Sequence, residues 1–318
     1  MPDLPVCLGV DTSNYTTSAA ISCGGEVTAN VRCPLKVLTG ERGLRQSDAV
    51  FQHTVNLPKV FGEIGKRDLR AVGVSATPRD CDGSYMPCFL AGVASATAIA
   101  ETWGVPLYRF SHQAGHIAAA LYSCGREDLH EGAFLAFHVS GGTTELTLVD
   151  HGRITLLGGT RDISAGKAID RIGVMLGLSF PCGGQLEALA EDVMTAKAGK
   201  LSIDGLFCNL SGLENKADAM LKQGAEPSAI AAYALRHILA VIERLTENAL
   251  MVYPDLPVIY AGGVMSNKTM RAHLSGRFGG FFADPCFSCD NAAGIARLTE
   301  LMADGILSTA ERGSHADR

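Results

Sequence analysis

His112 and His116 lie four residues apart in the segment HQAGHIAAALY, which has the composition of a helix. Side chains at this spacing share one face of a helix, and two imidazoles placed there can bind a single metal ion. The zinc-protease motif carries Glu directly after its first His as the general base, whereas this chain has Gln113. The pair therefore predicts a metal site and argues against a peptidase.

A third metal ligand must come from elsewhere in the chain. Asp290, at the expected start of the last helix, is our candidate. Cys286 and Cys289 form a CxxC sequence beside it, which offers an alternative Cys₂His₂ zinc site. A packed pair of structural histidines without any metal is the remaining interpretation.

Three turns have residue types that suit phosphate binding. Asp11–Thr17 and Ser140–Thr144 each connect two apolar strands, and in both a Ser is followed at positions +3 and +4 by two Thr. Small residues in such a turn let backbone N–H groups approach phosphate oxygens. In the first turn we single out Asp11 and Ser13. The third turn, Ala261–Gly263, places Gly262 and Gly263 between a strand and a helix; ordinary tight turns are the alternative for all three.

Asp170 lies on an expected helix beside the second turn. Its carboxylate suits either of two roles, a hydrogen-bond acceptor for a ribose hydroxyl or a solvated acid in a surface salt bridge. The residues alone leave both roles open.

Strand-like and helical segments alternate along the chain, which predicts an α/β fold with largely parallel sheets. The repeated strand–turn–strand motif predicts two related lobes. We expect residues 1–130 to form the first lobe with the histidine helix, and residues 131–318 to form the second, with the last helix packing back on the first. Among the expected helices are 184–196 and one following Ser266 as its N-cap.

The composition is that of an ordinary globular protein, with 47% hydrophobic and 19% charged residues. The net charge of −6 argues against a broad cationic surface that would grip nucleic acid unaided. No apolar run approaches the length of a membrane span, and ten scattered cysteines suit reduced thiols. We therefore expect a cytoplasmic protein without a membrane segment.

Six segments, in this order, resemble the motifs of the tRNA threonylcarbamoyltransferase family, also labelled TsaD and formerly O-sialoglycoprotein endopeptidase. They are HQAGH (112–116), HVSGGTTEL (138–146), SAGKAIDRIGVMLGLSFPCGG (164–184), NLSGLENKA (209–217), AGGVMSN (261–267) and CDNAA (289–293). The resemblance covers nearly the whole chain. It implies an actin-like fold of the sugar-kinase and Hsp70 type, with ATP or an acyl-adenylate in a cleft between the lobes.

The resemblance also implies site residues and a reaction. His112, His116 and Asp290 match the family's ligands for one divalent ion, iron or zinc. Further positions match residues that bind the nucleotide or adenylate: His138, Val139, Ser140, Gly141, Gly142, Asp170, Gly183 and Asn267. Family members transfer a threonylcarbamoyl group from its adenylate to N6 of adenosine 37 in tRNA. They work with partner subunits, including an inactive paralogue and an ATPase.

This chain departs from the family pattern at four places. The first turn usually reads Glu-Thr-Ser-Cys-Asp-Glu-Thr, but here it is Asp11–Thr17 with two acids lost. Thr143 replaces a His, Lys167 replaces a Glu, and residues 77–84 replace a Gly-Pro-Gly loop. We expect the tRNA reaction; the alternatives are a divergent carbamoyl-type transferase with another acceptor and a nucleotide-binding subunit of a modification complex.

Overall fold

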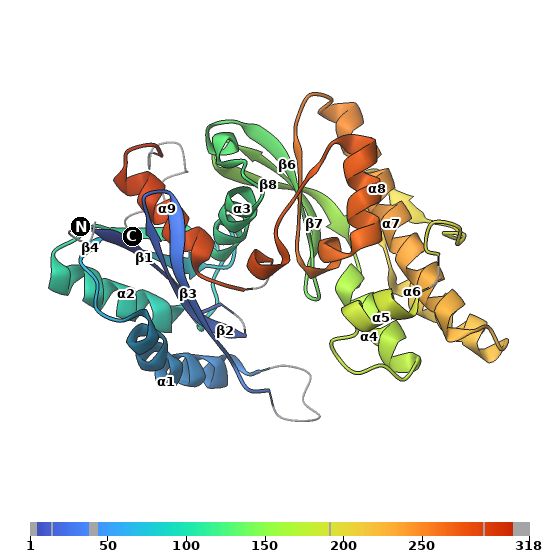
Figure 1. The fold of residues 1–318 in the computed structure, drawn as a ribbon, viewed down its shortest axis with the longest axis horizontal. Helices are drawn as coiled ribbons and strands as arrows, with labels where there is room; N and C mark the ends of the chain where they lie inside the picture. Colours follow the sequence, from blue (N-terminus) through green and yellow to red (C-terminus); the bar gives the residue numbers. More distant parts are fainter. Residues whose placement is uncertain (1–4, 14, 38–43, 191, 289, 308–318) are drawn as a thin grey trace. The chain divides into compact units, whose positions relative to one another are not determined.

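Two mixed β-sheets, each with its own helices, organise the chain (Figure 1). The computed structural model describes residues 5–13, 15–37, 44–190, 192–288 and 290–307. The first unit comprises the residues up to Gly132, the short segment Asp150–Ile154, and the chain from Cys286 onward. The second unit comprises Ala133–Val149 and Thr155–Pro285. The last helix thus belongs to the unit that holds the N-terminal strands.

The sheet of the first unit has five strands in the order β3-β2-β1-β4-β5. Their bounds are β1 Val6–Asp11, β2 Thr16–Cys23, β3 Glu26–Pro34, β4 Leu69–Thr77 and β5 Leu107–Ser111. The first predicted hairpin is confirmed, because β1 and β2 pair antiparallel. The prediction of largely parallel sheets is wrong here: β2 also pairs antiparallel with β3, and only β1–β4 and β4–β5 are parallel. The hairpin continues into a third strand instead of crossing over.

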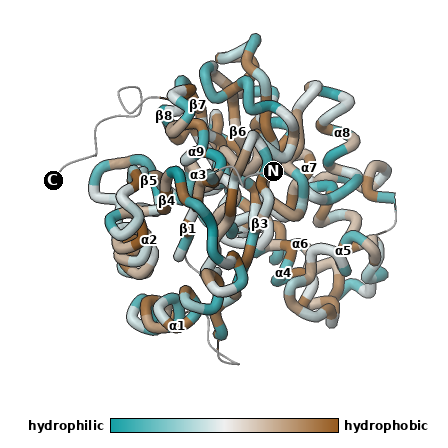
Figure 2. Tube along the Cα trace, turned by 60° about the vertical axis from the view of Figure 1, so that its left-hand side comes forward, coloured by the Kyte–Doolittle hydropathy of each residue, from teal (hydrophilic) through white to brown (hydrophobic). Residues whose placement is uncertain are grey.

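Helices cover both faces of this sheet. The helices are α1 (Gln46–Ile64), α2 (Phe89–Trp103), α3 (His112–Ser123) and α9 (Ala293–Ala303). Leu8 and Val10 of β1 share a buried cluster with Leu57 of α1 and Ala96 of α2. On the opposite face, Gly9 meets the backbone of α9. Both brown and teal residues occur along α1 in Figure 2, as expected for a helix with one buried and one exposed face.

The sheet of the second unit has seven strands in the order β12-β11-β6-β7-β8-β10-β9. Their bounds are β6 Ala133–Val139, β7 Thr144–Asp150, β8 Arg153–Thr160, β9 Ser202–Asp204, β10 Phe207–Asn209, β11 Val258–Ala261 and β12 Phe281–Phe282. The helices are α4 Ala165–Met175, α5 Gly183–Leu189, α6 Ser211–Lys222, α7 Pro227–Val252 and α8 Lys268–Phe278. Short 3₁₀ helices lie at η1 Glu127–Glu131, η2 Gly263–Ser266 and η3 Pro285–Phe287. The apolar face of α7 forms much of the core of this unit.

Three expected helix boundaries are wrong, each because a polar side chain bonds to nearby backbone. The helix expected at 184–196 ends at Leu189, and Asp192 accepts hydrogen bonds from backbone N–H groups after it. Asn267, not Ser266, caps α8 by accepting from Met270 N. The last helix begins at Ala293 and leaves Asp290 in the preceding turn. In the described part of the chain, no helix is long and apolar enough to cross a membrane.

Candidate metal centre and phosphate-binding turns

The first turn of α3 presents the two histidines. Ser111 caps the helix by accepting a hydrogen bond from Ala114 N, so the helix begins at His112 itself. His112 and His116 therefore lie on successive turns of one face, with ring centroids 4.3 Å apart. Both side chains are mostly buried, 13% and 12% exposed. The local helix geometry alone makes them available to one ion.

Asp290, just before α9, completes a set of three ligand groups within the first unit. Its Oδ1 lies 3.6 Å from Nε2 of His112 and 3.4 Å from Nε2 of His116. One ligand atom from each of the three residues lies within 4.8 Å of the others. Metal–ligand bonds of about 2.0–2.1 Å in a tetrahedral site place neighbouring ligand atoms roughly 3.4 Å apart. The three side chains therefore fit a zinc-sized or iron-sized ion.

The electrostatics of this cluster favour a positive charge at His112 between the negative charges of Asp11 and Asp290. Burial by itself lowers the pKa of His112, but the charges of Asp11 and Asp290 and their hydrogen bonds raise it to about 10. Burial raises the pKa of Asp290, yet its hydrogen bonds and charge interactions with both histidines outweigh this and lower it below its usual range. In the metal-free protein, a proton on His112 thus takes the place of the cation.

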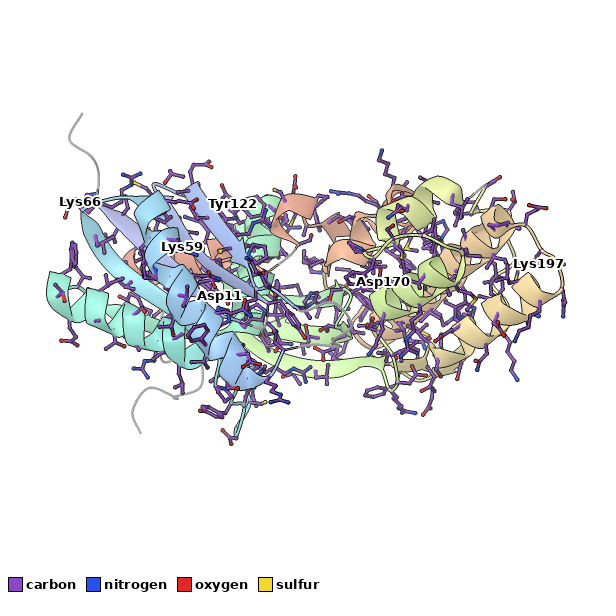
Figure 3. The ribbon with its side chains drawn as sticks, turned by 90° about the horizontal axis from the view of Figure 1, so that it is seen from below. Asp11, Lys59, Lys66, Tyr122, Asp170 and Lys197 are labelled. Carbon is purple, nitrogen blue, oxygen red and sulfur yellow. The ribbon has the colours of Figure 1, made fainter. Side chains whose placement is uncertain are left out.

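Asp11 contacts His112, one of the three candidate metal ligands. Its Oδ2 lies 2.7 Å from Nδ1 of His112, and its Oδ1 accepts from Ser13 N at 2.7 Å. Burial would raise the pKa of Asp11, but the charge of His112 and the bonds from His112 and Ser13 lower it. Asp11, the last residue of β1, is labelled in the blue part of the ribbon in Figure 3. Sequence analysis missed this contact, since no local pattern links residues 101 positions apart.

The alternative zinc site needs two cysteines, of which only Cys286 is among the described residues. Cys289 lies outside them, and Cys286 is exposed. Among the described residues, Cys286 does not belong to the set of metal-ligating side chains at His112. The histidine–aspartate set is the one that the structure brings together.

The altered loop at residues 77–84 is attached to the first turn of α3. Pro78 O accepts a hydrogen bond from Gln113 N, the residue after His112. Within the loop, Arg79 N donates to Oγ of Ser84 and Thr77 Oγ1 donates to Arg79 O. The segment in which this chain differs from the family pattern therefore adjoins His112, a candidate metal ligand.

The second predicted turn, in the second unit, has a backbone open to a ligand. Ser140 N donates to Thr143 O, and Ser140 Oγ accepts from Thr143 N, which closes the turn. A Cβ on Gly141 or Gly142 would meet nothing within 4 Å. The N-terminus of α4 packs behind the turn, with Gly166 N donating to Ser140 O. An anion can thus approach the two glycines closely.

The third turn lies next to the second because β6 and β11 are parallel neighbours, with Ala261 opposite His138. The carboxyl ends of the two strands therefore share one sheet edge, where α/β proteins bind ligands. Gly262 has φ +96°, and a Cβ there would lie 2.3 Å from Val139 O. Only glycine fits this position, while a Cβ on Gly263 would meet nothing within 4 Å.

The remaining predicted residues of the second unit have local structural partners. Asp170, on the yellow-green helix α4 in Figure 3, accepts from Cys182 N at 2.8 Å, and so supports the turn that leads into Gly183 at the start of α5. Asn267 is buried, with its Oδ1 used to cap α8. The bond from Cys182 N uses only one carboxylate oxygen of Asp170. The role of Asp170 as an acceptor for a ribose hydroxyl therefore stays a prediction.

The model of the family described as tRNA N6-adenosine threonylcarbamoyltransferase (TsaD) matches residues 47–297. A protein of that name from Thermus thermophilus is 32% identical over 278 residues, covering 83% of this chain and 82% of the relative. Another from Streptococcus pneumoniae is 33% identical over 235 residues, covering 70% of this chain and 67% of the relative.

Solved structures agree on the fold. Full-length HypF in its phosphate- and nucleotide-bound form has a TM-score of 0.63 at 10% identity, covering 96% of this chain and 47% of that one. The activator of 2-hydroxyisocaproyl-CoA dehydratase from Clostridium difficile with bound ADPNP has a TM-score of 0.54 at 14% identity, covering 98% and 100%. The expected actin-like α/β fold is confirmed. With its family match and its relatives above 30% identity, the chain belongs to the tRNA N6-adenosine threonylcarbamoyltransferase family.

Proposed function

We propose that this protein transfers a threonylcarbamoyl group from threonylcarbamoyl-adenylate to N6 of adenosine 37 in tRNA. The observation that carries the proposal is the three-residue ligand set, His112, His116 and Asp290, within a chain whose family match spans most of its length. The matched relatives carry the name of this activity. It is an acyl-type transfer and involves no peptide hydrolysis.

His112, His116 and Asp290 would hold one divalent ion, either iron or zinc. When bound, such an ion acts as a Lewis acid that polarises an acyl or phosphoryl oxygen. In the second unit, Ser140, Gly141 and Gly142 would offer backbone N–H groups to the phosphate of the adenylate, or of ATP.

Other predicted side chains complete the adenylate site in this proposal. Asp170 would accept a hydrogen bond from a ribose hydroxyl through its second oxygen. The remaining contacts proposed for the adenylate come from Ser13, His138, Val139, Gly183, Gly262, Gly263 and Asn267.

We further infer that partner subunits help to bring the tRNA to this chain. The net charge of −6 gives no general attraction for phosphate. A paralogous protein and an ATPase are the partners that the family resemblance implies. A cytoplasmic location accords with the nine cysteines of the described chain, all of which are free thiols.

The alternative acceptors draw no support from the relatives, whose names all refer to threonylcarbamoyl transfer or threonylcarbamoyladenosine. We therefore interpret the changed 77–84 loop beside α3 as sequence variation among proteins that catalyse the same reaction. A purely non-enzymatic role leaves the convergence of three ligand side chains without a purpose.

To test the proposal, the chain is expressed in cells depleted of their own transferase. The modified adenosine in their tRNA is then quantified by mass spectrometry. We expect modification with the natural chain and with Asp255→Ala, an exposed control in the second unit. We expect none with Asp290→Ala. Purified protein is assayed in parallel with threonylcarbamoyl-adenylate, tRNA and partner subunits. Folded, metal-loaded protein that modifies no tRNA in either assay would contradict the proposal.

A further inference from the structure

The carboxylate of Asp11 has both oxygens engaged inside the first unit. Oδ2 lies 2.7 Å from Nδ1 of His112, and Oδ1 accepts from the backbone N–H of Ser13 at 2.7 Å. The side chain is 1% exposed. An ionised carboxylate can only accept hydrogen bonds, so Nδ1 of His112 must carry the proton between them.

This assignment determines which nitrogen of His112 is available for a metal. With the proton on Nδ1, a neutral imidazole has its lone pair on Nε2. Nε2 is the nitrogen that faces Oδ1 of Asp290, at 3.6 Å. The ring is thus presented in the tautomer and orientation that metal binding needs, as in carboxylate–histidine–metal arrangements.

We propose that Asp11 is a positioning residue of the metal centre, which holds His112 as the Nδ1–H tautomer and couples the turn after β1 to the metal. This inference rests on the proposed metal centre. It replaces the nucleotide-binding role expected for Asp11 from the sequence. Both oxygens of the Asp11 carboxylate are engaged by His112 and Ser13, which favours the positioning role over contact with a nucleotide.

Asp11→Asn is the sharpest variant, because Asn has the same shape but only one acceptor oxygen. If its Nδ2 faces His112, Nδ1 of His112 must accept, and the proton moves to the metal-binding nitrogen. If its Nδ2 faces Ser13, two donors meet and a buried backbone N–H loses its partner. Either orientation loses one of the two bonds.

The first test measures Zn²⁺ affinity by competition with a chelator for the natural chain, Asp11→Asn and His112→Ala. Asp162→Asn is the matched control, since Asp162 accepts backbone N–H bonds in the other unit. We expect Asp11→Asn to bind Zn²⁺ about 10- to 100-fold more weakly, and the control to bind normally. If His112→Ala loses Zn²⁺ and Asp11→Asn does not, the positioning role is wrong. If His112→Ala also keeps full affinity, the metal centre itself is wrong.

A second measurement distinguishes a positioning role of Asp11 from a role in folding alone. Imidazole ¹H–¹⁵N NMR of the zinc-loaded natural chain should show His112 protonated at Nδ1, in slow exchange with solvent because of its burial. This measurement needs no variant, so it decides the question even if Asp11→Asn folds poorly. An unprotonated Nδ1 would overturn the proposal. Unfolding curves in excess EDTA check that Asp11→Asn and Asp162→Asn have comparable stability.

Discussion

Gly115 of α3 and Gly294 of α9 pack backbone against backbone: a Cβ on Gly294 would lie 1.8 Å from Gly115 O. Gly115 lies between the two histidine ligands in sequence, and Gly294 lies four residues after Asp290. The close approach of these helices therefore brings the third ligand to the first two. Small residues at this crossing let α3 and α9 approach each other closely beside the three candidate ligands.

Gly294→Ala should consequently weaken both the fold and the metal site. The clashing atoms are backbone, so α9 must move away from α3, at a cost of about 1–3 kcal/mol of unfolding free energy. Denaturant unfolding and a Zn²⁺ titration measure the two effects. Gly276→Ala is the control, because its Cβ would meet nothing within 4 Å in α8 and alanine favours helix. Unchanged stability and Zn²⁺ affinity in Gly294→Ala would show that the helix contact does not limit the site.

The pH dependence of metal binding follows from the pKa of His112, about 10 in the metal-free protein. At neutral pH a metal must displace the proton from Nε2, so apparent Zn²⁺ affinity should rise about tenfold per pH unit between about pH 6 and 8.5. In the absence of metal the trend in stability is opposite. Because the folded pKa lies above the ordinary value of 6.5, the stabilisation by protonated His112 is complete below pH 6.5 and is lost as pH rises towards 10.

Thermal unfolding across this pH range, in EDTA and in buffered excess Zn²⁺, checks both signs. His112→Gln is the reference, since it removes the titrating imidazole. A wild-type melting temperature in EDTA that rises with pH relative to His112→Gln would contradict the assigned protonation.

The sequence predicts the parts of this site that depend on local geometry. The four-residue spacing of His112 and His116 specifies a shared helix face wherever the helix lies. Two apolar strands joined by a small, polar turn specify the hairpin of β1 and β2. Both predictions needed only the period of the backbone and the preferences of turn residues.

Other features depend on long-range contacts or on competition between polar groups. The bond between Asp11 and His112 forms only when β1 and α3 meet in the folded unit. Apolar periodicity overestimated the length of α5, because it takes no account of the backbone bonds that Asp192 accepts. In the same way, Asn291 accepts from Ala293 N and delays the start of α9.

Arg297 of α9 should be important for the stability of the first unit. It is 4% exposed and donates to both oxygens of Glu127, to Ser22 Oγ and to Glu300. Arg297→Met should cost about 3–5 kcal/mol of unfolding free energy, because it leaves buried Glu300 without its cation. Denaturant unfolding measures the loss. Lys222→Ala breaks an exposed ion pair with Asp218 and should cost less than about 1 kcal/mol. Equal costs would mean that the buried network contributes nothing beyond a surface pair.

The open backbone of the second turn predicts a substitution that affects binding without affecting folding. A Cβ on Gly142 meets no protein atom within 4 Å, so Gly142→Ala should unfold like the natural chain. If phosphate approaches this backbone, the added methyl group should obstruct it and weaken ADP binding roughly tenfold, about 1.4 kcal/mol. Isothermal titration calorimetry measures this affinity. Gly212→Ala, which adds a methyl group in open space on α6 of the same unit, should bind ADP normally. Equal ADP affinity in the natural chain, Gly142→Ala and Gly212→Ala would place the phosphates away from the Ser140–Thr143 turn.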